Sequence, residues 1–505
     1  MKIRPNYRGT AGHFTDALVA SEIAQLHRGD VPYFECRLDS VRLRVERTRG
    51  IAAFKKTPRE HCLEKVSEIT QADIQEQVSL LEIAIGNGPP VPNYLRHAPT
   101  ESVPQMLTFL ARLVVDQAFE PSGAARWLTL RGDVSGSDLR VFVGDRSYFA
   151  GDAGILLALQ AYDSVVHDAK VAAFLDRQAL NWLPEVVEVD DVPVILGFSG
   201  LGGALLAADG LLQLAPSRWS HLLGWINQTV CRIDEDAVAV KGGDVIAGTA
   251  GLMIALASHR RSRSSSRPRH VRLLESIRAN VATAASRNEG LLFLSGSSAS
   301  PLGYAHGWAG VCVSMLAGLK STESSIYEDV LMQAATGAAD FITRNGGALN
   351  PVEASYPADD MNLSWCNGAA GFLRGSMARG LPRVEELDQH TATIFLKMNA
   401  RVGKLDDLRF CCGDMGVVDL LLDVGLAARS SYAYDTSIMA GNAVLQRAVA
   451  GIKNGTSTPE LAFPGLFQNL SGILYTGCRL LNPALRSLSG QASTDLDCAP
   501  IAAQC

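Results

Sequence analysis

From Pro104 onward the chain repeats one pattern, in which a glycine-rich step opens an apolar run. The step is Gly-x-x-Gly or a near relative, and 45 to 61 residues separate the second glycines of successive steps. The seven steps are Gly151/Gly154, Gly200/Gly203, Gly248/Gly251, Gly307/Gly310, Gly368/Gly371, Gly413/Gly416 and Asn469/Gly472. Runs such as residues 155–159 and 473–475 are apolar nearly all round, which predicts helices buried on most faces.

The segments between these runs are more charged, and each repeat has room for two helices. A repeat of this length is typical of an array or a closed ring, whereas a propeller would need four short strands per repeat. We therefore predict an all-α protein, a double-layered α/α toroid of seven inner and seven outer helices. Glycine turns at one end of the inner ring would let backbones crowd near the axis, and we expect the functional site there.

Residues 1–97 lack this repeat. Residues 86–92 (Gly-Asn-Gly-Pro-Pro-Val-Pro) have the composition of a linker. We therefore predict a separate N-terminal domain over 1–97 and the toroid over 98–485. Periodicity is lost after Pro483, which indicates a tail over 486–505.

Composition narrows the class of protein. Hydrophobic residues make up 47% of the 505 residues and charged residues 19%, enough for a sizeable core. With a net charge of −6, the chain as a whole lacks the basic excess that is typical of nucleic-acid-binding proteins. The N-terminus has no signal-peptide pattern, and no uncharged apolar run reaches the ~18 residues of a membrane helix. We expect a cytoplasmic protein without a membrane span, whose ten cysteines are thiols or metal ligands.

Three cysteines precede two neighbouring glycine steps: Cys366 in one turn, and Cys411 with Cys412 in the next. Adjacent thiols close a disulfide only with strained geometry, but both can bind one soft metal ion. Zinc suits such a thiolate set, and three protein ligands leave the fourth position open, as in catalytic sites. Buried free thiols are the alternative, but three at equivalent turns favour zinc.

His306 lies at the corresponding turn of the preceding repeat, where it can donate or accept a proton. Asp244 is either a helix N-cap or a group that orients His306, and the residues alone leave both possibilities open. We also expect Trp308 and Asn367 to contact the substrate. A thiolate-rich zinc site beside an acid suggests Michael-type addition of a thiol to a dehydrated residue.

The motifs His-Gly-x-x-Gly, Trp-Cys-x-Gly-x-x-Gly and Cys-Cys-Gly follow one another in this order. Over about residues 100–485 the chain resembles the lanthionine synthetase C-like cyclases, and Cys-Cys-Gly is similar to the three-cysteine zinc sites of some class II (LanM-type) lanthipeptide synthetases. The resemblance implies zinc on Cys366, Cys411 and Cys412, with Asp244 and His306 as acid–base residues. It implies lantibiotic biosynthesis, in which a dehydrated ribosomal precursor peptide receives lanthionine or methyllanthionine rings.

Residues 26–34, with Arg-Gly-Asp-Val-Pro-Tyr-Phe at their centre, resemble the closing part of the class II dehydratase domain. We therefore interpret residues 1–97 as a remnant of that domain. Cyclisation is expected from this chain alone and dehydration is not, so a separate dehydratase is a possible partner. Two departures from the family pattern bear on proton delivery. Asn367 stands where relatives often have His or Tyr, and Asn362 where stand-alone cyclases tend to have Arg.

Two other functions compete with this interpretation. One is a non-catalytic, zinc-loaded module of the same fold that binds a peptide or a thiol. The other is an α/α-toroid glycoside hydrolase, which would need paired carboxylates at the rim. The rim turns offer Asp152, Asp244 and Asp414, but their spacing does not define a pair.

Overall fold

The computed structural model describes residues 34–45, 51–52, 56–71, 74, 102–120, 123–132, 139–182, 196–233, 244–262, 268–286, 302–317, 319, 327–349 and 361–502. The chain forms two compact units, Met1–Leu81 and Glu82–Cys505. The linker predicted over 86–92 lies outside the described residues, as does most of the motif at 28–34. The boundary at residue 97 therefore stays a prediction.

The N-terminal unit contains an antiparallel meander and one helix. Strand β2 (Arg42–Val45) pairs with β1 (Phe34–Cys36) and with β3 (Ile51–Ala52). Helix α2 (Pro58–Glu68) begins at a capping box, in which Thr57 and Glu60 satisfy each other's backbone amides. Proline at the first helical position strengthens this start.

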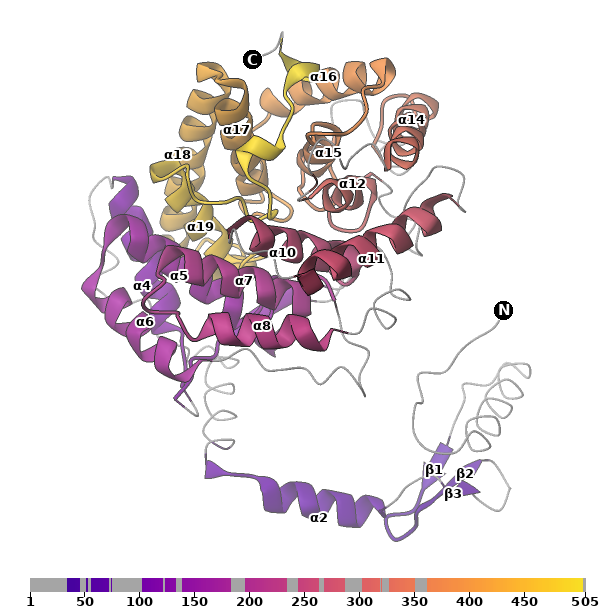
Figure 1. Ribbon diagram of the computed structural model, residues 1–505. Helices are drawn as coiled ribbons and strands as arrows, with labels where there is room; N and C mark the ends of the chain where they lie inside the picture. The colour runs from indigo at the N-terminus through magenta and orange to yellow at the C-terminus, as the bar shows by residue number, and fades with distance from the viewer. Residues whose placement is uncertain are drawn as a thin grey trace. The chain divides into compact units, whose positions relative to one another are not determined.

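Seven helices form an inner ring within the described part of the second unit, and each packs against the next (Figure 1). They are α5 (Asp152–Val166), α7 (Leu201–Leu214), α10 (Thr249–Ser262), α12 (Trp308–Leu316), α15 (Ala369–Ser376), α17 (Asp414–Ala428) and α19 (Leu470–Leu481). Helix α19 packs back on α5, which closes the ring. The predicted inner layer is confirmed.

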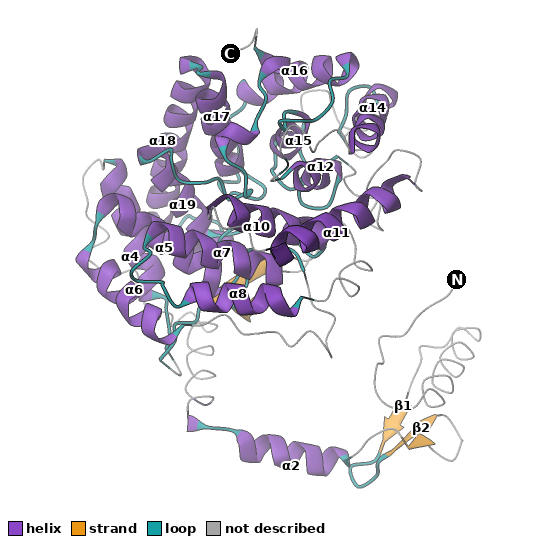
Figure 2. Ribbon diagram, in the orientation of Figure 1, coloured by secondary structure: helices purple, strands orange, loops and turns teal. Residues whose placement is uncertain are grey.

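Seven further helices among the described residues form the outer layer, against the inner ring (Figure 2). They are α4 (Val103–Asp116), α6 (Ala169–Asn181), α8 (Leu222–Arg232), α11 (Pro268–Ser286), α14 (Glu328–Arg344), α16 (Glu385–Asn399) and α18 (Ser431–Asn454). Burial separates the two layers. Residues 152–163 of α5 are all buried, whereas α6 buries the single stripe Val171, Phe174, Leu175 and Gln178. The second unit is therefore a double-layered α/α toroid, and among its described residues a hairpin of β4 (Leu128–Gly132) and β5 (Leu139–Val143) follows α4.

A closed ring of seven backbone hydrogen bonds joins the turns that precede the inner helices. Each turn's amide donates to the carbonyl of the next turn, at 2.8–3.1 Å. In order, the residues are Phe149, Phe198, Val245, Ala305, Cys366, Cys411 and Phe467, which donates back to Phe149. A Cβ at any second glycine of the seven steps would lie 1.9–2.3 Å from a carbonyl oxygen of its own turn. The repeated glycine is therefore required by close backbone approach.

The centre of this rim is filled by aromatic side chains. The ring of Phe467 has its centroid 5.0–6.0 Å from those of five other rings, contributed by four of the rim turns. These partners are Tyr148, Phe149, Phe198, Trp365 and Phe410. Packed rings at these distances add to the stabilisation that each side chain gains from burial. The rim turns are therefore held together by one aromatic cluster around Phe467.

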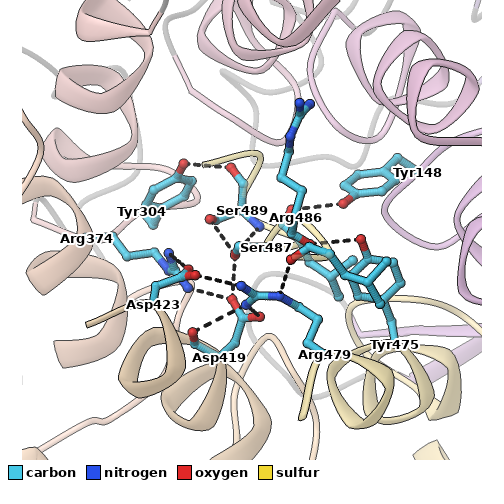
Figure 3. A network of polar contacts seen from close by, with 12 residues as sticks. Tyr148, Tyr304, Arg374, Asp419, Asp423, Tyr475, Arg479, Arg486, Ser487 and Ser489 are labelled. Carbon is cyan, nitrogen blue, oxygen red and sulfur yellow. Dashed lines mark hydrogen bonds and ion pairs between the residues drawn. The ribbon is translucent and has the colours of Figure 1, made fainter. Parts of the chain in front are cut away.

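The predicted tail is part of this unit. Leu488 and Ser489 have no exposed surface, and short helices η5 (Ser493–Asp495) and η6 (Ala499–Ile501) follow. Beside the tail lie four buried ions, in which Arg374 and Arg479 each pair with both Asp419 and Asp423 (Figure 3). Two arginines and two carboxylates balance, which is how buried charges are tolerated. Within the described residues, no helix is both long enough and apolar enough to span a membrane.

Candidate metal centre and acid–base pair

Three thiols meet at the rim, as the sequence predicts. Cys366 lies in the turn before α15, and Cys411 and Cys412 lie in the turn before α17. Their Sγ atoms all lie within 4.8 Å of one another, and those of Cys366 and Cys412 are 3.8 Å apart. The amide of Cys366 donates to the carbonyl of Cys411 at 3.1 Å, so the backbone ring holds the two turns together.

This cluster fits a tetrahedral zinc ion. Two thiolates bound to one zinc at about 2.3 Å lie about 3.8 Å apart, which matches the separation of Cys366 and Cys412. Sulfur donors select zinc over the harder magnesium and calcium ions. Cys366 and Cys411 are buried and Cys412 is half-buried, so one side of the cluster faces the rim surface. Three donors would leave one coordination position for a substrate.

Neighbouring groups shift the pKa values of the three thiols. Hydrogen bonds from Cys411 and Cys412 hold the pKa of Cys366 well below its usual range, against the effect of burial. Ser364, whose Oγ lies 3.6 Å from its sulfur, and the charge of His306 act in the same direction. The pKa values of Cys411 and Cys412 are raised well above the usual range, because both share hydrogen bonds with Cys366 and are buried. The cluster therefore favours a thiolate that is stabilised by hydrogen bonds from the neighbouring thiols.

His306 and Asp244 lie on the two preceding turns of the rim. Nδ1 of His306 lies 3.7 Å from Oδ2 of Asp244, and 37% of the imidazole side chain is exposed. Two backbone hydrogen bonds link the three turns. The amide of Val245 donates to the carbonyl of Ala305, and the amide of Ala305 donates to the carbonyl of Cys366. Oδ1 of Asp244 also accepts the amides of Ala247 at 2.5 Å and Gly248 at 3.2 Å. One oxygen of Asp244 therefore caps the turn before α10, not the helix itself, which begins at Thr249, and the other oxygen faces His306. Whether Asp244 orients His306 stays a prediction.

The ion pair shifts the pKa values of both residues. Burial lowers the pKa of His306, but the nearby carboxylate of Asp244, with a contribution from Cys366, raises it above its ordinary value. Burial raises the pKa of Asp244, yet His306 and the two capping amides bring it below its ordinary value. The pair therefore favours imidazolium beside carboxylate, a form in which His306 can donate a proton.

The two residues expected to contact a substrate lie in different surroundings. Asn367 is half-buried at the rim, and its backbone N–H donates to Ser364 Oγ at 3.2 Å. Trp308 is 2% exposed, and its Nε1 donates to the carbonyl of Ala334 in α14 at 2.9 Å. In this conformation Trp308 fastens α12 to the outer layer. Substrate contact by either residue stays a prediction.

Asp145, Asp407 and Arg409 were not identified from the sequence, and Asn362 was noted there only as a departure from the family pattern. Asp145, Asn362 and Asp407 stand nine residues before the second glycine of their steps, and each accepts the amide two residues later at 2.9 Å. Asn362 therefore closes a turn in the way that aspartate does in two other repeats. Arg409, two residues before Cys411, donates hydrogen bonds to both carboxylate oxygens of Asp407, and its charge offsets part of the rise in the pKa of Cys412. The shared spacing is the signal that could have revealed these turns.

The structure gives no support to a carboxylate pair of the glycosidase kind. Asp152 is buried against Arg126 at 2.9 Å and Arg146 at 3.5 Å. Asp414 is buried and accepts the amides of Gly403 and Leu405. Both carboxylates are buried and bound by groups of the toroid wall.

The fold and the site define an α/α-toroid protein with a three-thiol candidate metal centre next to a histidine–aspartate pair. The model of the family described as "Lanthionine synthetase C-like protein" matches residues 143–490, more than half of the chain. The chain belongs to this family, which confirms the resemblance in its motifs. Among solved structures, nisin cyclase matches with a TM-score of 0.42 and 14% identity, over 67% of this chain and 89% of that chain. No curated protein sequence matches the chain.

Proposed function

We propose that this chain is a zinc-dependent lanthionine cyclase of the class II type. It adds cysteine thiols of a dehydrated ribosomal precursor peptide to dehydroalanine or dehydrobutyrine, and a separate dehydratase would supply those residues. One observation carries the proposal: Asp244, His306 and the three-thiol cluster stand on four consecutive turns of one rim, in a lanthionine synthetase C-like protein.

The reaction divides between the two halves of the site. The sulfur bonds to the β-carbon of the dehydrated residue, the carbon–carbon π bond breaks, and the α-carbon receives a proton. Zinc held by Cys366, Cys411 and Cys412 would supply deprotonation of the incoming thiol. His306 delivers the proton to the α-carbon, because Asp244 raises its pKa and orients the ring. One proton leaves sulfur and one enters carbon, so the product has the mass of the substrate.

A synthetic peptide with one cysteine and one dehydroalanine tests the proposal. The zinc-loaded chain should remove the free thiol, counted by alkylation, without changing the mass of the unalkylated peptide. His306→Asn should slow ring closure by ~10²–10⁴-fold, the usual contribution of a general acid, with zinc retained. A wild-type chain that binds zinc and the peptide but leaves every thiol free would be a non-catalytic module, and the enzyme proposal would be abandoned.

A further inference from the structure

The segment from Leu485 to Ser489 is buried, apart from the half-buried Arg486, although it forms no helix or strand. Four side chains of the ring bind its carbonyl oxygens (Figure 3). Arg479 donates to Leu485 at 2.8 Å, Tyr475 to Arg486 at 2.8 Å, Tyr148 to Leu488 at 3.1 Å and Tyr304 to Ser489 at 2.8 Å. Buried carbonyls need such partners, so these contacts hold the segment in place.

Tyr304 connects this segment to the reactive part of the rim. It is fully buried and directly precedes Ala305 and His306. Its ring lies 4.9 Å from that of Trp365, the residue before Cys366. The amide of Ala305 also donates to the carbonyl of Cys366 at 3.0 Å. A single side chain thus contacts Ser489, the turn of His306 and the turn that bears a candidate zinc ligand.

Tyr148 is the counterpart of Tyr304 in another repeat. Each stands six residues before the second glycine of its step, and each donates to a carbonyl of the same buried segment. Tyr148 is 2% exposed, so both tyrosine side chains are buried. Its turn, residues 149–151, carries none of the candidate metal-binding or acid–base residues. The chain therefore offers a matched control for the role of Tyr304.

We propose that Tyr304 is a positioning residue, which uses its hydrogen bond to Ser489 to hold the turn of His306 in register with Asp244 and Cys366. This inference rests on the proposed function, because it assigns Tyr304 a part in proton delivery. Displacing a catalytic group by about 1 Å can reduce a rate about 100-fold, and such groups depend on neighbours whose own side chains are locked. The C-terminal segment is then part of the support of the active rim.

The first test compares Tyr304→Phe with Tyr148→Phe in zinc-loaded protein. Each substitution removes one hydroxyl from one carbonyl of the segment, so the melting temperature should fall by a similar amount in both. Tyr304→Phe should lower kcat on the cysteine–dehydroalanine peptide by about 10- to 100-fold with KM unchanged. Tyr148→Phe should keep the wild-type kcat. Equal loss in both variants, or no loss in Tyr304→Phe, would overturn the proposal.

The second test does not depend on activity. Amide hydrogen exchange of a peptide covering residues 303–307 should accelerate in Tyr304→Phe, because the amide of Ala305 loses its fixed geometry, and should be unchanged in Tyr148→Phe. Unchanged exchange in Tyr304→Phe would refute the positioning role even if the chain were not a cyclase. A wild-type chain that never closes the ring would refute the proposed function instead, so the two failures are distinct.

Discussion

Nδ1 of His306 lies 3.7 Å from Oδ2 of Asp244, across two neighbouring turns of the rim. This separation is longer than a hydrogen bond, so the interaction is an ion pair of partly buried groups. It explains the opposite shifts of the two groups, with the pKa of His306 raised and that of Asp244 lowered against the effect of burial. Because Asp244 is the main group that raises the pKa of His306, removing its carboxylate gives a direct test.

Asp244→Asn should move the alkaline limb of the pH–rate profile to lower pH. His306 must be protonated to act as the acid, so the rate falls as the pH rises through its raised pKa. Without the carboxylate, burial dominates and the pKa of His306 falls toward or below the ordinary value of about 6.5. The measurement is ring closure in single turnovers from pH 5 to 9. Asp176→Asn, which removes an exposed carboxylate on α6, should leave the limb in place. If the alkaline limb stays in place in Asp244→Asn, Asp244 does not set the pKa of the proton donor.

We expect one zinc ion per chain, and marked loss of zinc in Cys411→Ala with the helical content retained. Removing one of three thiolates deprives the ion of a protein ligand, while the toroid keeps its packed core. Metal analysis after dialysis and circular dichroism give the two readouts. Cys312→Ala is the control, since that buried thiol of α12 lies outside the cluster. Stoichiometric zinc in the single alanine variants of Cys366, Cys411 and Cys412 would refute the assignment.

Gly472→Ala and Gly224→Ala should change stability in opposite directions. A Cβ at Gly472 would lie 2.2 Å from the carbonyl oxygen of Leu466, so the rim turn must shift, and overpacking typically costs about 1–3 kcal/mol. Gly224 is exposed in α8 and a Cβ there meets nothing within 4 Å, so alanine should stabilise by about 0.5–1 kcal/mol. Denaturant unfolding measures both. Equal effects would show that close approach is not the reason for the repeated glycine.

The start of helix α2 in the N-terminal unit can be predicted from the sequence alone. Thr57, Pro58 and Glu60 form a capping-box signature, and α2 begins there. Such a start is a local property of a few residues, so the sequence contained it. By contrast, the charges of Asp419 and Asp423 interrupt a helix that is otherwise apolar, and their partners Arg374 and Arg479 lie 45 to 60 residues away. No local sequence pattern predicts that these charges pair with one another.

The sequence by itself determined the layers of the toroid and the turns that carry the site. The reason is physical: an apolar run buried all round and a glycine forced by a nearby carbonyl are requirements of the local chain, repeated seven times. It also placed Cys366, Cys411, Cys412 and His306 at equivalent turns, and closing the ring brings those turns together.

Only the tertiary structure decided where side chains point and what the last residues do. Trp308 follows His306 by two residues, but its indole is buried and donates a hydrogen bond to Ala334 in α14. The segment after Pro483 has no periodicity, yet Leu488 and Ser489 are buried because Tyr148 and Tyr304 bind their carbonyls. Those tyrosines precede their acceptors by 340 and 185 residues. A partner at that distance exists only once the ring has closed, because the fold alone brings the two groups together.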